Sequence, residues 1–228
     1  MTTHRCYIIC QYLEDIMEKV SLVLRHYNKF KPISCEIISG DINKLFTVKF
    51  NDNDNNGAEI IKGDPVLIGV LNGEDIEVNG GRVVGATPKE DKYIICSDDI
   101  VKMAKEFEKR DYDRYPASLL GDIKLINAIQ REPTCIKNIS YSGMCIYSDG
   151  DYEINDIVEI TIYLSNNVTK YDGTVLRKAK SYGRNEYGIQ IIHRDQNSME
   201  STKNQLFGLV QNERELMYRH ILSSRFKI

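Results

Sequence analysis

Two arginines four residues apart are the first feature of this sequence that could do chemistry. Arg110 and Arg114 enclose Asp-Tyr-Asp and are followed at once by Tyr115-Pro116. A guanidinium presents a planar fork of N–H donors that can pair with the O6 and N7 acceptors of guanine or with a phosphate, and its flat face can stack on a base. Lysine cannot do both. The pair therefore predicts a ligand that carries guanine and phosphate, and the alternative is a solvated helix face without a ligand.

A second polar cluster follows in Asn138-Ile139-Ser140-Tyr141-Ser142-Gly143. Asn138 and Ser140 are two residues apart, so on an extended segment their side chains point to the same face. There the amide and the hydroxyl can meet a guanine edge or a phosphate oxygen, and Gly143 lets the backbone turn or approach closely. Taken alone, the same string is common in hairpin turns.

The order, spacing and context of the two clusters resemble the PilZ family, whose members are receptors for the second messenger cyclic di-GMP. The resemblance implies a six-stranded barrel and a ligand site formed by Arg110, Arg114, Asn138, Ser140 and Gly143. Lys109 is a further candidate phosphate contact, although a solvated lysine at a helix end is the alternative. The family usually has aspartate at the position of Asn138. An amide oxygen can still accept from guanine N–H groups, but without charge assistance, which puts the affinity in doubt.

The length of 228 residues suffices for two modest domains. We expect a boundary near residue 100, with domains over 1–100 and 101–228. An apolar repeat of three to four predicts an amphipathic helix over residues 5–27. Six short strand-like segments follow and predict a small antiparallel barrel: Cys35–Ile38, Leu45–Phe50, Pro65–Leu71, Ile76–Val78, Arg82–Val84 and Tyr93–Cys96. The glycine-rich stretch Asn79-Gly80-Gly81 is expected to be a turn. A helix over 100–109 should then lead into the arginine pair.

The second half predicts six further strands, at Leu119–Ala128, Thr134–Ile139, Met144–Ser148, Ile157–Leu164, Thr169–Leu176 and Tyr187–His193. A last helix over 198–222 carries an apolar stripe that either packs on its own barrel or forms a dimer seam. The predicted fold class is mainly β, with two small β-barrel domains and helices at both ends of the chain. The first domain, with Gly63-Asp64-Pro65-Val66 and its glycine-punctuated sheet, resembles the amino-terminal domain of flagellar-brake PilZ proteins.

Composition limits the classes of partner. The net charge of -3 and the isoelectric point near 5.9 give no global attraction to nucleic acid or to an anionic membrane, so neither DNA nor RNA is expected to bind. The six cysteines contain no Cys-x-x-Cys pair and are expected to be reduced in a cytoplasmic protein. No apolar run is long enough for a membrane span or a signal-peptide core.

Motifs for metals and catalysis are weak. The run from Asp52 to Gly57 matches the opening of an EF-hand loop, but its twelfth position is Gly63, where a bidentate glutamate is needed. His4 with Cys6 and Cys10 is the only candidate metal set. The sequence contains neither a Gly-x-Ser-x-Gly elbow nor a Walker-type phosphate loop. We therefore predict no metal, no catalytic cofactor and no enzymatic activity.

These features together predict a receptor that binds cyclic di-GMP at the junction of its domains, changes their arrangement and signals to a protein partner, as a monomer or a homodimer. The resemblance of the first domain favours control of flagellar motility through motor components. Control of polysaccharide synthesis or secretion, an enzyme activity in the first domain, and a PilZ module used only for protein contacts are the alternatives.

Overall fold

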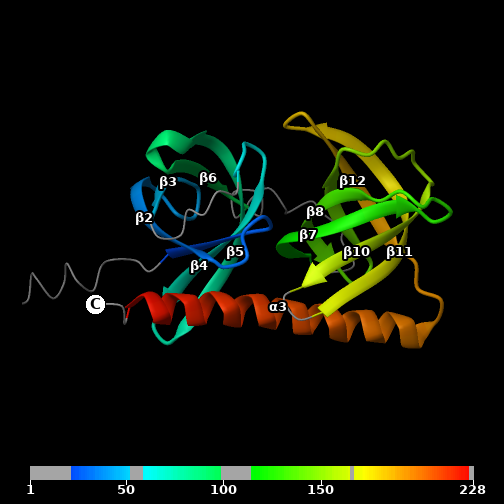
Figure 1. Cartoon of the computed structure of the whole chain (residues 1–228). Coiled ribbons are helices and arrows are strands. Elements are labelled where there is room, and N and C mark those ends of the chain that lie inside the picture. Colours follow the sequence, from blue (N-terminus) through cyan, green and yellow to red (C-terminus); the bar gives the residue numbers. More distant parts are fainter. Residues whose placement is uncertain (1–21, 52–58, 99–113, 165–166, 226–228) are drawn as a thin grey trace, which may run out of the picture.

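A computed structural model describes residues 22–51, 59–98, 114–164 and 167–225 of the chain. These residues form two closed antiparallel barrels of six strands each, which lie side by side, and one long helix that runs along the same side of both (Figure 1). The prediction of a mainly β chain with two small barrels is therefore confirmed.

The first barrel has the strand order β1-β2-β3-β6-β5-β4 and closes where β1 pairs with β4. Its strands are β1 (Leu22–His26), β2 (Ile33–Gly40), β3 (Leu45–Phe50), β4 (Pro65–Asn72), β5 (Asp75–Thr87) and β6 (Lys92–Ser97), with a short 3-10 helix at Pro88–Glu90. Phe46, Val48 and Phe50 alternate into the core, as residues of period two must when one face of a strand is buried. Their neighbours in the core include Ile68 and Ile95.

Two predictions about this barrel were wrong. Residues 22–26, placed at the end of the predicted amino-terminal helix, form β1, and the earlier part of that helix lies outside the described residues. All five residues of β1 are buried, because Leu22 and Leu24 face the barrel core while Val23 packs against the long helix. A strand buried on both faces loses the alternation that distinguishes it from a helix.

The second error is the turn at Asn79-Gly80-Gly81, which lies within the single continuous strand β5. Gly80 and Gly81 are needed in this strand because other atoms pack closely against it. A Cβ at Gly81 would lie 2.7 Å from the Cδ1 atom of Ile68, and one at Gly80 would lie 2.5 Å from Asp98 and 2.6 Å from Pro116. The helix expected over 100–109 lies outside the described residues.

The second barrel has the strand order β10-β11-β12-β9-β8-β7 and closes where β7 pairs with β10. Its strands are β7 (Tyr115–Leu125), β8 (Glu132–Ser140), β9 (Gly143–Ser148), β10 (Ile157–Leu164), β11 (Asn167–Ser181) and β12 (Arg184–Ile191). All six predicted strands are confirmed, although β7 begins earlier than predicted and β11 extends further. The core is built from side chains that are fully buried, such as Ile123, Ile136 and Tyr187.

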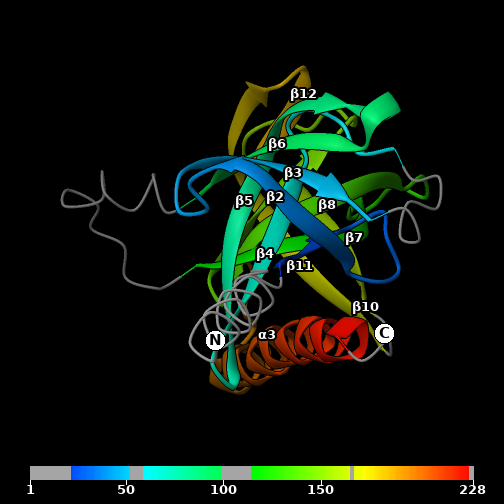
Figure 2. The same ribbon diagram turned by 90° about the vertical axis from the view of Figure 1, so that its left-hand side faces the viewer.

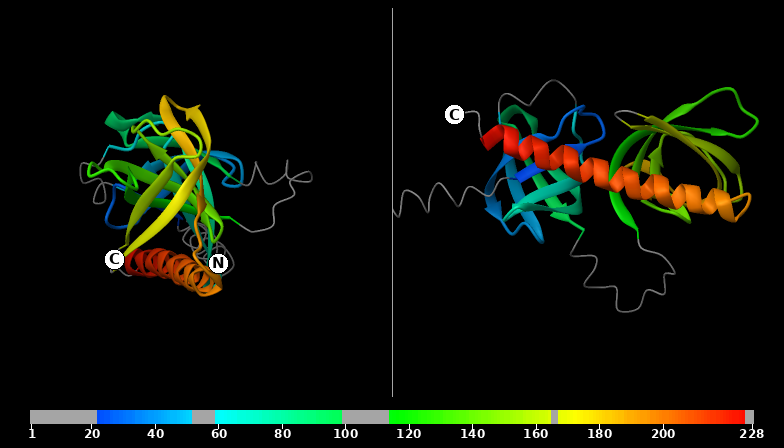
Figure 3. Two further views of the ribbon diagram at one scale, coloured as in Figure 1. Left: turned by 90° about the vertical axis from the view of Figure 1, so that its right-hand side faces the viewer. Right: turned by 90° about the horizontal axis from the view of Figure 1, so that it is seen from below.

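Helix α3 (Gln196–Arg225) confirms the predicted carboxy-terminal helix and connects the two barrels. A reciprocal cap begins it, since Asp195 accepts from the Ser198 backbone N–H at 2.7 Å and Ser198 Oγ accepts from the Asp195 N–H at 3.1 Å. The prediction that the helix packs only on its own barrel was incomplete. Its first half contributes Leu206 to the core of the second barrel, and its second half packs Met217 on the outside of the first barrel. Figures 2 and 3 show the helix crossing beneath both barrels.

The structure bears on three further expectations. Cys35, Cys135 and Cys145 are buried and Cys96 is half-buried, whereas Cys6 and Cys10 lie outside the described residues. The described part of the chain contains no group of three or more metal-ligating side chains. It also contains no helix with the length and apolar character needed to cross a bilayer.

We predict that Met217→Ala lowers the free energy of unfolding by about 2–5 kcal/mol, the usual cost of truncating a fully buried methionine. Phe207→Ala, on the same helix at a side chain that is 67% exposed, should change it by less than about 0.5 kcal/mol. Urea denaturation measures both values. Equal effects of the two substitutions would contradict the docking of α3 on the first barrel.

Candidate ligand site between the barrels

Strand pairing brings four of the six predicted site residues to one end of the second barrel. Pro116 pairs with Asn138 and Tyr115 with Ile139, so Arg114 precedes β7 directly opposite the end of β8. Ser140 in turn pairs with Gly143 across the β8–β9 turn. Lys109 and Arg110 lie outside the described residues, and their predicted roles stay predictions.

Asn138 offers an acceptor that no group in the described residues satisfies. A bulge in β8 between Ile136 and Asn138 interrupts the pairing with β9. The Asn138 side chain is half-buried, and its Oδ1 atom is buried without a hydrogen-bond partner among the described residues. A buried polar atom left unpaired costs about 1–3 kcal/mol. Such an atom is therefore well suited to accept a hydrogen bond from a ligand.

Ser140 and Gly143 shape the β8–β9 turn. The buried Ser140 hydroxyl donates to the Gly143 carbonyl oxygen at 3.0 Å and lies 3.2 Å from Ser142 Oγ. Its lone pairs can still accept from a ligand, but its proton is already used. A Cβ at Gly143 would lie 2.4 Å from the carbonyl oxygen of Ile189, so glycine is required there because β12 approaches closely. Contact of either residue with a ligand stays a prediction.

Sequence reasoning missed a charged cluster on the outer face beside these residues. Glu186 of β12 is buried, and its two carboxylate oxygens pair with Arg177 Nη2 at 2.7 Å and with Lys137 Nζ at 3.2 Å. Burial raises the pKa of Glu186, but the two cations outweigh that cost and the pKa is lowered overall, so the carboxylate is ionised at neutral pH. Nothing local in the sequence joins these three residues, since strand pairing alone brings them together.

The first barrel holds both ends of the segment that contains Lys109 and Arg110. The Asp98 backbone N–H donates to the Gly80 carbonyl oxygen at 2.8 Å, and Pro116 packs on the same glycine. The chain therefore leaves the first barrel and enters the second beside one position of β5. The described residues on either side of this segment therefore lie at the junction of the barrels.

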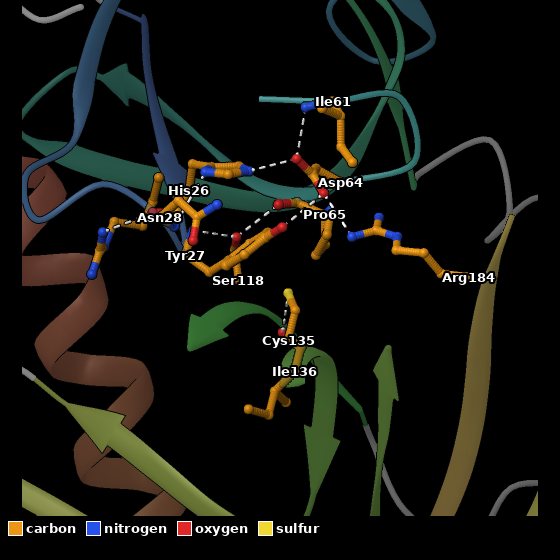
Figure 4. Close-up of polar contacts among 11 residues, drawn as sticks. His26, Tyr27, Asn28, Ile61, Asp64, Pro65, Ser118, Cys135, Ile136 and Arg184 are labelled. Atoms are coloured by element: carbon orange, nitrogen blue, oxygen red, sulfur yellow. Dashed lines mark hydrogen bonds and ion pairs between the residues drawn. The ribbon is translucent and has the colours of Figure 1, made fainter. Parts of the chain in front are cut away.

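A buried carboxylate joins the barrels close to this point. Asp64 is fully buried and accepts hydrogen bonds from His26 Nε2 at 3.1 Å, from Tyr27 Oη at 3.0 Å and from the Ile61 backbone N–H at 2.8 Å (Figure 4). Arg184 of the second barrel completes the set, with Nη1 at 2.9 Å from Asp64 Oδ1. One side chain thus connects a turn, a loop and both barrels.

Ser118 adds a second bridge, because its hydroxyl donates to the Pro65 carbonyl oxygen at 2.7 Å and accepts from the Tyr27 backbone N–H at 3.0 Å (Figure 4). Both groups that it contacts belong to the first barrel, whereas Ser118 lies in β7. The backbone next to Asp64 is therefore fixed to the strand that begins with Tyr115, at the same end of the second barrel as the candidate site.

Hydrogen bonding fixes the protonation state of His26. Its Nδ1 atom accepts from the Asn28 backbone N–H at 3.2 Å while Nε2 donates to Asp64. A ring with one accepting nitrogen is neutral. Burial accordingly lowers the pKa of His26 below its ordinary value of 6.5. Burial acts to raise the pKa of Asp64, but the hydrogen bonds from His26 and Ile61 and the charge of Arg184 lower it overall. The charged partner of Asp64 is therefore Arg184 and not His26.

The β11–β12 hairpin packs against the first barrel. Tyr182 and Gly183 form its two-residue turn with φ angles of 52° and 82°, as turns that match the twist of a hairpin require. The Tyr182 side chain covers Gly63, where a Cβ would lie 2.6 Å from the Cβ of Tyr182. Lys62 Nζ and the Arg82 guanidinium carbon lie 5.8 Å and 5.5 Å from the Tyr182 ring centroid. The Gly63-Asp64-Pro65 motif is therefore the docking point of this hairpin.

Comparison with known proteins agrees with the sequence-based identification. Residues 108–208 match the family model of the PilZ domain. This chain carries a PilZ domain, and its second barrel is the barrel of that domain. No curated protein matches the sequence.

Several solved structures are similar over most of their length. They include K. pneumonia MrkH in complex with c-di-GMP, at 10% identity over 92% of this chain and 95% of that chain with a TM-score of 0.40. Escherichia coli YcgR in complex with c-di-GMP has 11% identity over 91% of each chain and a TM-score of 0.41. The Bacillus subtilis inhibitor of motility MotI/DgrA has 15% identity over 86% of this chain and 98% of that chain, with a TM-score of 0.38.

The neutral state of His26 predicts that stability falls in mild acid. The unfolded chain protonates this residue near its ordinary pKa of 6.5, whereas the folded chain resists protonation. The contribution of His26 is therefore complete above pH 6.5 and is lost as the pH falls towards the lowered pKa, by at most about 1.4 kcal/mol per pH unit.

Urea denaturation at pH 7.5, 6.5 and 5.5 tests this prediction. His26→Gln lacks a titrating ring and should show a smaller loss of stability between pH 6.5 and 5.5 than the wild type. Identical losses in both proteins would show that another group causes the pH dependence.

Proposed function

We propose that the protein is a non-enzymatic cytoplasmic receptor for cyclic di-GMP. The observation that carries this proposal is that a PilZ barrel brings Arg114, Asn138 and the Ser140–Gly143 turn to one end, where an acceptor of Asn138 is buried with no partner among the described residues. A ligand with guanine N–H donors satisfies that acceptor. Its two phosphodiesters match the cations of the arginine motif.

The predicted site residues contact different parts of the ligand. Arg110 and Arg114 bind a guanine edge and a phosphate, and Lys109 adds charge near the phosphate. Asn138 accepts a hydrogen bond from guanine. Ser140 stabilises the turn by donating its proton and accepts from the ligand with its remaining lone pairs, and Gly143 has no side chain that would block the ligand.

Ligand binding changes the arrangement of the two barrels. The segment with Lys109 and Arg110 begins and ends beside Gly80 of the first barrel, so a ligand that fixes this segment on the second barrel acts at the junction. The ion pair of Asp64 with Arg184 and the Tyr182 contact at Gly63 are the interactions that such a change would alter. The extent of the change depends on how much more tightly cyclic di-GMP binds one arrangement than the other.

The output that we favour is contact with a protein of the flagellar motor, on the basis of the resemblance of the first domain to the amino-terminal domain of flagellar-brake proteins. Polysaccharide synthesis and secretion are alternative outputs of the same receptor. An enzyme activity in the first domain is a third alternative, but no observation on the described residues favours it.

Calorimetry with a set of nucleotides tests the receptor directly. The protein should bind cyclic di-GMP more tightly than GTP, GMP or cyclic di-AMP, because only cyclic di-GMP offers two guanines and two phosphodiesters together. Absent binding of cyclic di-GMP, or equal binding of cyclic di-AMP, would refute the proposed function.

Substitution of the motif residues tests their roles. Arg110→Ala and Arg114→Ala should each weaken cyclic di-GMP binding by roughly 10-fold or more, as expected for the loss of charge-assisted hydrogen bonds. Arg219→Ala removes an arginine from an exposed ion pair on α3 and serves as the control that should bind as the wild type does. Unchanged affinity in a motif variant that unfolds at the wild-type temperature would remove that arginine from the site.

The sign of the affinity change in one variant tests which part of the ligand lies beside Asn138. Asn138→Asp should tighten binding, because a carboxylate accepts guanine N–H bonds with charge assistance. Weaker binding would show that a phosphate lies beside this residue, since two anions repel. Calorimetry and thermal unfolding of the variant separate this effect from a loss of stability.

A further inference from the structure

A row of four outward-facing positions crosses the second barrel from the predicted site to Arg177. Asn138 of β8 pairs with Cys145 of β9, Cys145 pairs with Gly188 of β12, and Gly188 pairs with Arg177 of β11. Neighbouring strands are about 4.8 Å apart, so the backbone of Arg177 lies roughly 14 Å from that of Asn138. Only a long side chain directed along the row could reach the predicted site.

The Arg177 side chain takes this direction. The side chain lies over Gly188. A Cβ added at Gly188 would be 3.4 Å from the Cβ of Arg177 and 3.6 Å from its Nε. Its Nη2 atom is 4.0 Å from Cys145 Sγ. The guanidinium therefore lies beside β9, the strand that pairs directly with Asn138.

Electrostatics around Cys145 agree with this geometry. Burial and the charge of Glu186 raise the pKa of the Cys145 thiol, and the charges of Lys137, Arg177 and Arg114 each act against that rise. The charges of three cations therefore act on one sulfur atom: Lys137 of β8, Arg177 of β11 and Arg114, which directly precedes β7.

Glu186 positions Arg177 and leaves most of its N–H donors available to a ligand. One carboxylate oxygen accepts from Nη2 at 2.7 Å, and the other pairs with Lys137. A guanidinium has five N–H donors, and the Arg177 side chain remains 58% exposed. Because Lys137 alone can neutralise Glu186, the group carries an excess positive charge that faces outward. Only Glu186 of this pair is buried, and Lys137 already supplies the cation that its carboxylate needs, so the exposed Arg177 guanidinium is not required to neutralise it.

We propose that Arg177 is a ligand-binding residue that contacts the half of cyclic di-GMP farther from Arg114, and that Glu186 is its positioning residue. This inference rests on the proposed function. A second guanidinium fork at the other end of the row suits either a phosphodiester or the O6 and N7 edge of the second guanine. Glycine at 188 keeps the path of the Arg177 side chain clear.

Calorimetry with cyclic di-GMP on the full chain tests this assignment. Arg177→Ala should weaken binding by roughly 10- to 100-fold, as expected for lost hydrogen bonds to a charged group. Its thermal unfolding should match that of the wild type, since Lys137 continues to pair with Glu186. Lys180→Ala removes the same charge from an exposed position on the same strand and should bind with nearly wild-type affinity.

Wild-type affinity in Arg177→Ala would overturn the inference and leave the proposed function standing. Equal weakening by Lys180→Ala would also overturn it, because the effect would then reflect overall charge and not a contact. A wild-type protein that does not bind cyclic di-GMP would overturn both the inference and the proposed function.

Discussion

The buried carboxylate of Asp64 is the constraint on which the junction of the barrels depends. Removing a charge from water is costly unless hydrogen bonds and an opposite charge replace the solvent. Asp64 obtains these from the β1–β2 turn, from its own loop and, through Arg184, from the second barrel. If the barrels separated, a fully buried anion would lose its cation. The arrangement of the two barrels is therefore tied to one ion pair, while α3 connects them on another side.

Aromatic and charged contacts link this ion pair to the candidate ligand site. The Arg184 guanidinium carbon lies 4.6 Å from the ring centroid of Tyr147, and Lys137 Nζ lies 5.6 Å from the same centroid. Lys137 shares Glu186 with Arg177. A ligand anion that competes with Glu186 for either cation changes the charge next to Tyr147 and hence next to Arg184. We propose these contacts as the physical route by which ligand binding acts on the junction.

Local patterns in the sequence predicted most of the fold. Strands with one buried face, such as β3, alternate visibly, and all six strands of the PilZ barrel were found in this way. The failures have a common cause, because packing from outside overrode the local pattern. Helix α3 covers β1 and hides its alternation, while Asp98 and Pro116 require glycine in the middle of β5.

The motif predicted site residues near β8, and the pairing of β7 with β8 brings Arg114 to the same end of the barrel. The other features of the site and the junction depend on residues that are far apart in the sequence. The ion pair of Asp64 with Arg184, and the row of paired positions from Asn138 to Arg177, arise only through the register and closure of the barrels, which one sequence does not reveal. The unpaired acceptor of Asn138 is likewise a property of its surroundings and not of its residue type.

Chemical-shift mapping by NMR tests the central claim most directly, namely that cyclic di-GMP binds at the end of the second barrel and acts on the junction. On saturation with the ligand, the account predicts the largest shifts of backbone amides at Asn138–Gly143, together with shifts of the side-chain Nε–H signals of Arg177 and Arg184. Shifts confined to the first barrel, with the signals at Asn138–Gly143 and Arg184 unmoved, would contradict it.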